Sequence, residues 1–556
     1  MKKKILTKRL PFLLATIFFL VGLVTLSDYG INWDEPDHFM RGQTYLRYFL
    51  TGKKDYQGLP RLEFHYPKND RYQLPQNIEY KDDRQFRRSI YQNDSYTLAN
   101  WYKDDSGHPP LGDILAATTN WIFYQKLGIL GDIESYHLFE LLTGAILVLV
   151  VSLFAQETYG VFAGLIAGLS LALYPLFLGE SHFNIKDPVE TCFFGLTIYT
   201  FWKAIKNQSP KWMICSAAFC GIALGVKFNI IFVPLIILPW LFVRGIRRSL
   251  SKKILKSLFF YPLISFGIFF IFRPYLWSDP FNHTLEIIKY YQSIGLQQNF
   301  QPPNFYIFGF NTYPLQAVIF TTPLIILFFS LIGIIACFFL FKKEKGKTSF
   351  LWLLWLVIPI LRVTVPKTSI YGGVRQIMEY VPAMALLAGL GANYIATLLR
   401  SHLAKIVIVF MFIPIIFKLI SLHPNESLYF NPLIGGLKGA MVRNFPNWGL
   451  SLGNEYRQGI EWFNQNAPPQ ANLTLARGLL SNIPRIWIRQ DINFGDYYFS
   501  GPAQKGEYIM ELTHEGWESW ISAKAEYLQT LNPIYQLKVE GVTVLTIWKN
   551  SPEMVK

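Results

Sequence analysis

The sequence predicts a polytopic α-helical membrane protein that carries a small external α/β domain at its C-terminal end. Of its 556 residues, 51% are hydrophobic and only 16% are charged, whereas about 25% are charged in typical soluble proteins. The apolar residues form runs of the roughly 20 residues that a membrane helix needs. The net charge of +15 lies largely in short clusters between these runs, as the positive-inside rule expects. We therefore expect a lipid bilayer as the surroundings and no nucleic acid as a partner.

The apolar runs divide residues 1–421 into about eleven predicted membrane helices. The first run follows a Lys-rich N-terminus and is too long for a typical signal peptide, so we expect a retained signal anchor with a cytoplasmic N-terminus. The stretch 211–243 is split at a tight external turn over residues 225–228. The predicted helices are 10–27, 136–156, 160–179, 188–206, 211–226, 228–243, 254–275, 317–341, 349–365, 378–399 and 403–421.

The charges of the connecting segments indicate which side of the membrane each loop faces. The short loops on the side of the N-terminus are mostly basic, and Lys and Arg in short loops favour the cytoplasmic side. Because the helix count is odd, the C-terminus is expected on the other side. The segments expected outside are 28–135, 180–187, 276–316, 366–377 and 422–556.

Two external regions differ from the rest in composition. Residues 422–556 have a lower apolar density, with a predicted helix at 455–466 and a predicted hairpin at 533–548 that turns at residues 540–541. We expect this region to form the small α/β domain. Residues 52–107, inside the first external loop, are rich in Tyr, Asp, Asn and Arg. We interpret them as an insertion, which is either a lid or acceptor-contacting surface or a plain solvent loop.

Two short motifs in the first external loop are candidates for chemistry. Asp34 and Glu35 are adjacent carboxylates just beyond the first predicted helix, where charge near hydrocarbon is costly and usually functional. His108 begins the sequence His-Pro-Pro-Leu, and proline is favoured in the first turn of a helix. Taken alone, each motif is better explained by a solvated acid pair or a chance proline turn. Their order and their shared side of the membrane favour a functional site.

In this order, the acidic pair and the His-Pro-Pro-Leu motif resemble the GT-C membrane glycosyltransferases. The resemblance is to the dolichyl-phosphate-mannose protein mannosyltransferase family (glycosyltransferase family 39), in its bacterial branch, and also to the aminoarabinose transferase. The run at residues 423–436 is similar to one in bacterial members, and the β-trefoil insertion of eukaryotic members is absent. The resemblance covers most of residues 10–470, with gaps, and implies a GT-C fold in the bacterial inner membrane with a periplasmic C-terminal domain.

The resemblance also implies an activity. Members move a sugar, with inversion, from a polyprenyl-phosphate donor to an external hydroxyl, here of a protein Ser or Thr, a lipid or a cell-envelope glycan. Such a transfer needs a base for the acceptor proton and positive charge for the phosphate leaving group. Asp34 aligns with the first acid of the family's pair and is the expected base. Glu35 is expected to orient the acceptor or to hold a neighbouring arginine.

Several further residues are expected to contact the substrates. Arg41 either reaches a lipid phosphate or extends to lipid headgroups. Asp187 either belongs to a Lys-Asp-Pro segment that resembles one in the family or simply caps the next helix. Arg273 and Arg375 are either site residues or interfacial anchors. The expected substrate-binding residues are Arg41, His108, His182, Lys186, Asp187, Arg273 and Arg375.

Asp113 marks a departure from the family pattern, because many eukaryotic relatives carry lysine at this place after the His-Pro-Pro motif. The departure leaves open which cation meets the phosphate. Nearby cations would serve without a metal, and the four cysteines have no metal-ligand spacing. No cofactor is therefore predicted with certainty, and a divalent metal stays open.

Two other functions share part of this pattern. A transporter or flippase of lipid-linked sugars would have similar helices and basic loops, but it would more often show inverted repeats and charges in the middle of helices. A non-catalytic envelope assembly factor would be indistinguishable by sequence. The clustering of acids on one face of the membrane favours the transferase.

Overall fold

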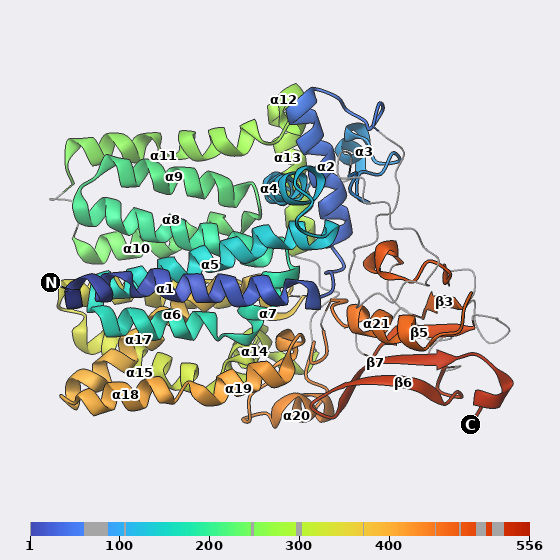
Figure 1. The fold of residues 1–556 in the computed structure, drawn as a ribbon. Helices are drawn as coiled ribbons and strands as arrows, with labels where there is room; N and C mark the ends of the chain where they lie inside the picture. The colour runs from blue at the N-terminus through green and yellow to red at the C-terminus, as the bar shows by residue number, and fades with distance from the viewer. Residues whose placement is uncertain are drawn as a thin grey trace.

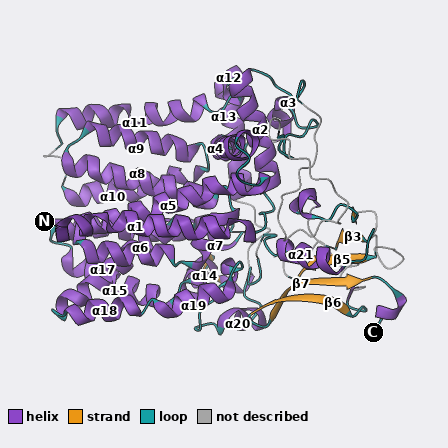
Figure 2. Cartoon of the chain, viewed as in Figure 1, coloured by secondary structure: helices purple, strands orange, loops and turns teal. Residues whose placement is uncertain are grey.

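The computed structural model describes residues 2–59, 87–104, 107–245, 250–295, 303–370, 372–450, 452–476, 480–495, 507–513 and 528–556. Most of the described chain is a bundle of helices that lie side by side, with the N-terminus at one end (Figure 1). Short helices and a β-sheet gather at the opposite end, where the C-terminus lies (Figure 2). About half of the predicted insertion, residues 60–86 with 105–106, lies outside the described residues.

All eleven predicted ranges contain helix. Two of them contain a break, between α6 and α7 and between α14 and α15, and a third is divided between α18 and α19. The bundle consists of α1 (Lys2–Thr25), α5 (Asp132–Tyr159), α6 (Val161–Ala172), α7 (Pro175–Phe183), α8 (Asp187–Asn207), α9 (Pro210–Leu224), α10 (Val233–Arg244), α11 (Lys252–Ile271), α14 (Tyr313–Thr321), α15 (Leu324–Leu340), α16 (Glu344–Arg362), α17 (Tyr380–Leu398), α18 (His402–Phe410) and α19 (Ile413–Leu422).

The number of membrane spans is smaller than predicted when length and composition are applied to these helices. Among the described residues, five helices are long and apolar enough to cross a membrane. The number rises to seven if α6 with α7, bent by 59°, and α14 with α15, bent by 119°, each count as one span. The count of eleven is therefore not confirmed, partly because α9 and the segment Phe228–Arg244 are apolar but short.

Small residues allow the central helix α17 to approach its neighbours closely. A Cβ atom added at Gly391 would lie 2.0 Å from the carbonyl oxygen of Phe329 on α15. One added at Gly333 of α15 would lie 2.0 Å from the carbonyl oxygen of Leu387. Small residues at such crossings are how helices pack where lipid, rather than water, surrounds the bundle.

A layer of short helices covers the end of the bundle opposite the N-terminus. Helix α2 runs across the ends of the bundle helices (Figure 1), and the side-chain amide of Gln43 fixes it there by donating to Asn120 (3.0 Å) and to the hydroxyl of Tyr136 (2.6 Å). The described flanks of the predicted insertion pack on the same helix, since Trp101 donates to the hydroxyl of Thr44 (3.2 Å). This layer comprises α2 (Glu35–Thr51), α3 (Leu98–Asp104), α4 (Leu111–Asn120), α12 (Tyr275–Ser278) and α13 (Pro280–Gly295).

The described part of the C-terminal region contains a mixed sheet of five strands in the order β4-β3-β5-β7-β6. Strand β3 pairs in parallel with β4 and β5, whereas β7 pairs antiparallel with β5 and β6. The predicted hairpin and helix are confirmed. Glu540 (φ 52°) and Gly541 (φ 78°) form the turn, as two-residue hairpins with positive φ require. The elements are α20 (Gly436–Val442), α21 (Tyr456–Asn466), β3 (Asn472–Leu475), β4 (Asn493–Phe494), β5 (Tyr508–Leu512), β6 (Pro533–Val539) and β7 (Val542–Lys549).

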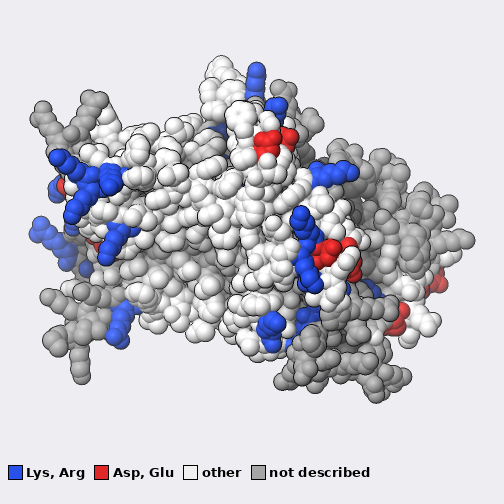
Figure 3. All heavy atoms as spheres, turned by 90° about the horizontal axis from the view of Figure 1, so that it is seen from above, with Lys and Arg blue, Asp and Glu red and all other residues white. Residues whose placement is uncertain are grey.

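The surface charges divide the molecule into three zones. Figure 3 shows Lys and Arg at the left end, where Figure 1 places the N-terminus, then a broad band of uncharged side chains, then both signs of charge at the right end. An uncharged band between two charged ends is typical of a multi-pass membrane protein. The sheet and the layer of short helices lie beyond the band, on one side of it.

Candidate functional site

Asp34 and Glu35 are adjacent in sequence, but their side chains enter different environments. Asp34 lies just before the first residue of α2, its side chain is 64% exposed, and one of its carboxylate oxygens lies 3.8 Å from Nη2 of Arg375. The side chain of Glu35 is only 1% exposed. It accepts a hydrogen bond from the backbone N–H of Asn32 (2.7 Å) and lies 3.3 Å from Nε2 of His137 on α5.

The contacts of Glu35 correct one of its expected roles. Its polar neighbours in the described part of the chain are Asn32, His137, Glu140 and the backbone of Ile185, and no arginine is among them. Burial raises the pKa of Glu35 well above its ordinary value, because a desolvated carboxylate is disfavoured in its charged form. Of these two carboxyl groups, that of Asp34 is exposed and that of Glu35 is buried.

Arg375 connects Asp34 to a second carboxylate, that of Asp187. The Nη1 atom of Arg375 donates to Asp187 at 2.9 Å, and Nζ of Lys227 donates to the same carboxylate at 2.5 Å. Burial alone would raise the pKa of Asp187, but Lys227 and Arg375 outweigh it and hold this pKa well below its usual range. The alternative that Asp187 serves simply as a helix cap is wrong, because its carboxylate is the centre of this ion-paired group.

A second buried ion pair joins α2 to α4. The guanidinium of Arg41 donates from Nε to Asp113 at 2.6 Å and also contacts Nδ1 of His38, while His38 lies 3.1 Å from the other oxygen of Asp113. All three side chains are buried. Burial and the charge of Lys186 lower the pKa of His38 to about 4, so this imidazole is neutral at pH 7. The aspartate that departs from the family pattern thus positions the arginine of α2.

Lys186 and His108 lie close to this pair, and the charge of Arg41 acts on both of them. Burial and the charge of Arg41 lower the pKa of Lys186 to about 7. Burial and the charges of Lys186 and Arg41 hold the pKa of His108 well below its ordinary value, and its Nε2 lies 3.2 Å from the hydroxyl of Tyr290 on α13. Arg273 is buried, stacks over the ring of Phe269 at 5.4 Å and adds to the field at His108.

We call Arg41, Lys186, Arg273 and Arg375 the cation cluster. Two of them are ion-paired with carboxylates, Arg41 with Asp113 and Arg375 with Asp187. Besides burial, Lys186, Arg41 and Arg273 contribute to the lowered pKa of His108, and Arg41 contributes to that of Lys186, so several cations lie close together here. Such a region favours an anionic group because a bound anion would relieve this repulsion.

His182 is the one expected binding residue that the structure does not bring to this cluster. Its Nδ1 lies 2.8 Å from the carbonyl oxygen of Leu178, and its Nε2 lies 3.4 Å from the hydroxyl of Thr25. Its ring stacks on Tyr29 at a centroid distance of 4.2 Å. Both ring nitrogens thus have partners inside the bundle, where the side chain joins α7 to α1.

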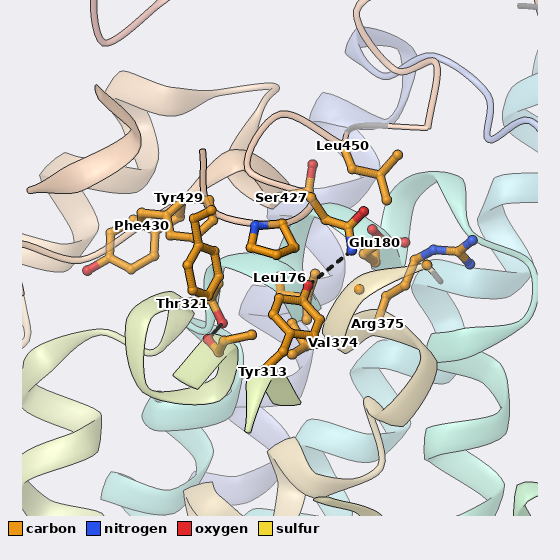
Figure 4. Close-up of a pocket in the computed structure, with 16 residues that line it drawn as sticks. Leu176, Glu180, Tyr313, Thr321, Val374, Arg375, Ser427, Tyr429, Phe430 and Leu450 are labelled. Atoms are coloured by element: carbon orange, nitrogen blue, oxygen red, sulfur yellow. Dashed lines mark hydrogen bonds between the residues drawn. The ribbon is translucent and has the colours of Figure 1, made fainter. Parts of the chain in front are cut away.

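A pocket opens beside Arg375, between α7, α14 and the segment that leads to the C-terminal region. Figure 4 shows Arg375 and Glu180 near each other at one side of the pocket and Tyr429 and Phe430 at the other. Tyr313 lines it as well, and its hydroxyl accepts a hydrogen bond from Asn447 (3.1 Å). Arg375 therefore contacts both this pocket and the exposed carboxylate of Asp34.

Some of the gathered residues were not predicted as site residues. His38 and Lys227 each bind a carboxylate of the site. The sequence contained an indication of both. His38 precedes Arg41 by three positions and therefore shares its helix face. Lys227 lies in the predicted external turn at residues 225–228. The sequence did not indicate His137 and Glu140, which face Glu35, as site residues, because they fall in an apolar run.

Comparisons with known proteins relate the chain to membrane glycosyltransferases. Residues 107–277 match the family model described as dolichyl-phosphate-mannose-protein mannosyltransferase. No match was found among curated proteins. Among solved structures, the fold is similar to that of ArnT from Cupriavidus metallidurans bound to undecaprenyl phosphate, with 13% identity, a TM-score of 0.50 and coverage of 96% of this chain and 97% of that one.

A second solved structure in the comparison is the archaeal oligosaccharyltransferase AglB from Archaeoglobus fulgidus in complex with an inhibitory peptide and a dolichol-phosphate. It has 12% identity, a TM-score of 0.48 and coverage of 100% of this chain and 75% of that one. The match to the family model and the fold shared with ArnT confirm the resemblance to the GT-C membrane glycosyltransferases that the sequence motifs indicated.

Proposed function

We propose that the chain is an inverting glycosyltransferase that moves a sugar from a polyprenyl-phosphate donor to an external hydroxyl, with Asp34 as the general base. The observation that carries this proposal is the placement of Asp34. Its carboxylate is 64% exposed, at the edge of a buried and net positive cluster, and 3.8 Å from the nearest arginine. The site therefore offers a proton acceptor and an anion-binding region side by side.

The chemistry needs both features. The acceptor hydroxyl attacks the anomeric carbon, the bond from that carbon to the phosphate oxygen breaks, and its electron pair leaves with the phosphate. Asp34 takes the hydroxyl proton, and Arg375 beside it keeps the carboxylate in place. Lys186 and Arg41, which the structure holds near His108, would stabilise the charge that develops on the leaving phosphate. Inversion follows from a single displacement with one base.

The position of the cation cluster, as well as its charge, supports a lipid-linked phosphate as the donor. The cation cluster lies at the end of the bundle where α2 crosses the helix ends (Figure 1). At such a level a lipid-linked phosphate reaches protein cations while its chain stays in the bilayer. We propose that this end faces the periplasm, because the opposite end carries the basic loops (Figure 3). The acceptor would then approach from the side of residues 422–556.

The pocket beside Arg375 is the proposed acceptor site. Its aromatic lining, with Tyr313, Tyr429 and Phe430, would stack on a sugar ring or a peptide. Glu180 and Arg375 supply polar groups on the side nearest Asp34 (Figure 4). A hydroxyl held there would be presented to the base. The hydroxyl would belong to a protein Ser or Thr, a lipid or a cell-envelope glycan.

The test is transfer of label from a radiolabelled polyprenyl-phosphate sugar to an envelope extract by the purified protein. We expect transfer by the wild type and a loss of at least about a hundredfold in Asp34→Asn, because general bases contribute 10²–10⁴ in rate. Asp37→Asn is the matched control, since Asp37 is an exposed acid on the same helix turn. Its turnover should stay within a few-fold of wild type.

Two outcomes would contradict the proposal. Near-normal turnover of Asp34→Asn would remove Asp34 as the base. Transfer from a nucleotide sugar alone, with no lipid intermediate present, would remove the lipid-phosphate donor. The chain shows no Gly-rich nucleotide-binding motif after a strand, so we expect no such transfer.

A further inference from the structure

Three buried side chains converge where α2 begins. Glu35 comes from the start of α2, and His137 and Glu140 come from α5. Their exposed fractions are 1%, 1% and 0%. One donor atom from each residue can be chosen so that these atoms all lie within 4.8 Å of one another. His137 and Glu140 are three positions apart, so they share a helix face.

The two carboxylates of this group have few partners in the described part of the chain, although the charge of Arg457 acts on His137. Among the described residues, no donor is in hydrogen-bonding geometry with either oxygen of Glu140 or with Oε1 of Glu35. The backbone of Asn184 and Ile185 and the facing carboxyl of the other glutamate are their polar neighbours. Within the described residues, the ion pair of Glu35 is with His137, and neither glutamate is paired with Lys or Arg. Two buried carboxylates in contact with so few donors are costly unless something positive lies between them.

We propose that Glu35, His137 and Glu140 bind a divalent transition-metal ion such as Zn²⁺ or Mn²⁺. The residue types fit, since imidazole and carboxylate are common ligands of these ions. The spacing fits too. Ligands bonded to Zn²⁺ at 2.0–2.1 Å in a tetrahedral arrangement lie about 3.3 Å apart, and Oε2 of Glu35 lies 3.3 Å from Nε2 of His137.

The charge count supports a divalent ion. Two carboxylates and one neutral imidazole carry two negative charges, which one divalent cation balances. A His-x-x-Glu pair on one helix, completed by a glutamate from another, is also an arrangement that helical bundles use to hold metals in their core. Each contacting group comes from the protein, so the ion would join α2 to α5 rather than touch the acceptor.

The inferred ion has a structural consequence for the site. Glu35 follows Asp34 directly, so fixing its carboxylate against α5 also fixes the backbone from which Asp34 extends. The ion would thus position the base without taking part in proton transfer. It is independent of the proposed function, since an ion could tie these helices together whatever the activity.

The competing occupant is a proton. Two neighbouring carboxyl groups in a low-dielectric environment can share one proton instead of binding a metal. A metal and a proton differ in measurable ways. A bound metal gives a stoichiometric metal content and an unfolding temperature that depends on a chelator, whereas a shared proton gives neither.

The experiment measures metal content in the full-length protein in detergent. The protein is treated with a chelator, equilibrated separately with Zn²⁺ and Mn²⁺, freed of excess ion and analysed by plasma mass spectrometry, with thermal unfolding recorded alongside. We expect about one ion per chain and a higher unfolding temperature with the ion. Glu140→Gln and His137→Gln should each weaken binding at least about tenfold, the loss typical even of residues that only support a ligand.

Glu190→Gln is the matched control, because Glu190 is a buried glutamate of α8 that lies outside the proposed ligand set, and it should keep the full metal content. Asp34→Asn should keep it too, which separates this site from the proposed base. Wild-type protein that holds neither ion after equilibration would overturn the inference without reference to any variant. Equal metal content in Glu140→Gln, His137→Gln and wild type would overturn it as well, since the ion would then lie elsewhere.

Discussion

Two regions of opposite charge meet at the start of α2, and adjacent residues belong to them. Asp34 faces the cation cluster, where carboxylates and cations alternate: Arg375 lies between Asp34 and Asp187, and Arg41 is held by Asp113. Glu35 faces an acidic group on α5, where Glu140 has no protein cation within ion-pairing distance in the described chain. Around Asp34 the protein supplies cations that pair with its carboxylates, whereas around Glu35 the carboxylates have no Lys or Arg partner among the described residues.

The difference teaches that an acidic pair need not act as a unit. Consecutive residues at the start of an α-helix point about 100° apart, so a helix that lies across the bundle ends exposes one side chain and buries the next. Charge compensation within the cation cluster fixes its geometry while leaving positive charge in excess. The uncompensated acidic group instead requires a cation or a proton from outside. Three predictions test the region around the cation cluster, and they are given from the largest expected effect to the smallest.

Arg41→Met should cause the largest loss of stability. The substitution removes the guanidinium from a buried pair, and His38 is then the one ion-pair partner of Asp113 among the described residues. Breaking one side of a buried ion pair typically costs about 3–5 kcal/mol. We expect a clear fall in the midpoint of thermal unfolding in detergent.

The double variant Arg41→Met with Asp113→Leu sharpens the comparison. It removes both charges, so it should recover most of the lost stability, because replacing a buried pair by apolar residues is often neutral. In both the single and the double variant, the KM for the lipid donor should be raised above that of the wild type, since both lack the Arg41 cation. A single variant as stable as the wild type would show that Asp113 does not depend on Arg41, and the picture of internal compensation would fail.

The second prediction is a pH dependence that comes from Lys186, whose pKa is lowered to about 7 by burial and by Arg41. Its ammonium group is protonated below this pKa and neutral above it. A phosphodiester donor keeps its negative charge throughout this range. Donor affinity should therefore fall as pH rises from 6 to 8, by up to about tenfold, since the protonated fraction falls by about that factor.

Lys186→Arg separates this effect from other titrations. Arginine stays charged over the whole range, so KM for the donor should become nearly independent of pH between 6 and 8 in this variant. Lys227→Arg is not a suitable control, because Lys227 holds Asp187. An unchanged pH profile in Lys186→Arg would mean that another group, and not Lys186, meets the phosphate.

The sequence predicted the elements of the fold better than their mutual arrangement. All eleven helical ranges and the hairpin that turns at residues 540–541 were visible, because hydropathy and turn chemistry are local. The bends between α6 and α7 and between α14 and α15 were not, since both halves of each pair are apolar. The count of spans therefore could not be settled from apolar length alone.

The site was predictable where charge stood out from an apolar or external background. Asp34, Arg41, Lys186 and Arg375 were identified for that reason, although which acid each cation meets was not. Asp113 meets Arg41 across 72 positions of sequence, and such pairings depend on how helices pack. The direction of Glu35 was missed because the helix phase of α2 cannot be read from one acidic pair, and the burial of His182 was missed because its loop was expected outside.

The smallest predicted effect concerns His108 and the hydroxyl of Tyr290, which lies 3.2 Å from its Nε2. Tyr290→Phe removes one hydrogen-bonding group while keeping the ring that packs edge-on against the imidazole. A single hydrogen bond contributes about 0.5–1.5 kcal/mol, so kcat/KM should fall roughly two- to tenfold if Tyr290 positions His108 for the substrate. The same substitution made in His108→Gln should cost almost nothing, because residues that act through one another are not additive. Equal losses in both backgrounds would show that Tyr290 does not act through His108, and the contact between them would then serve to pack α13 against the segment that leads into α4.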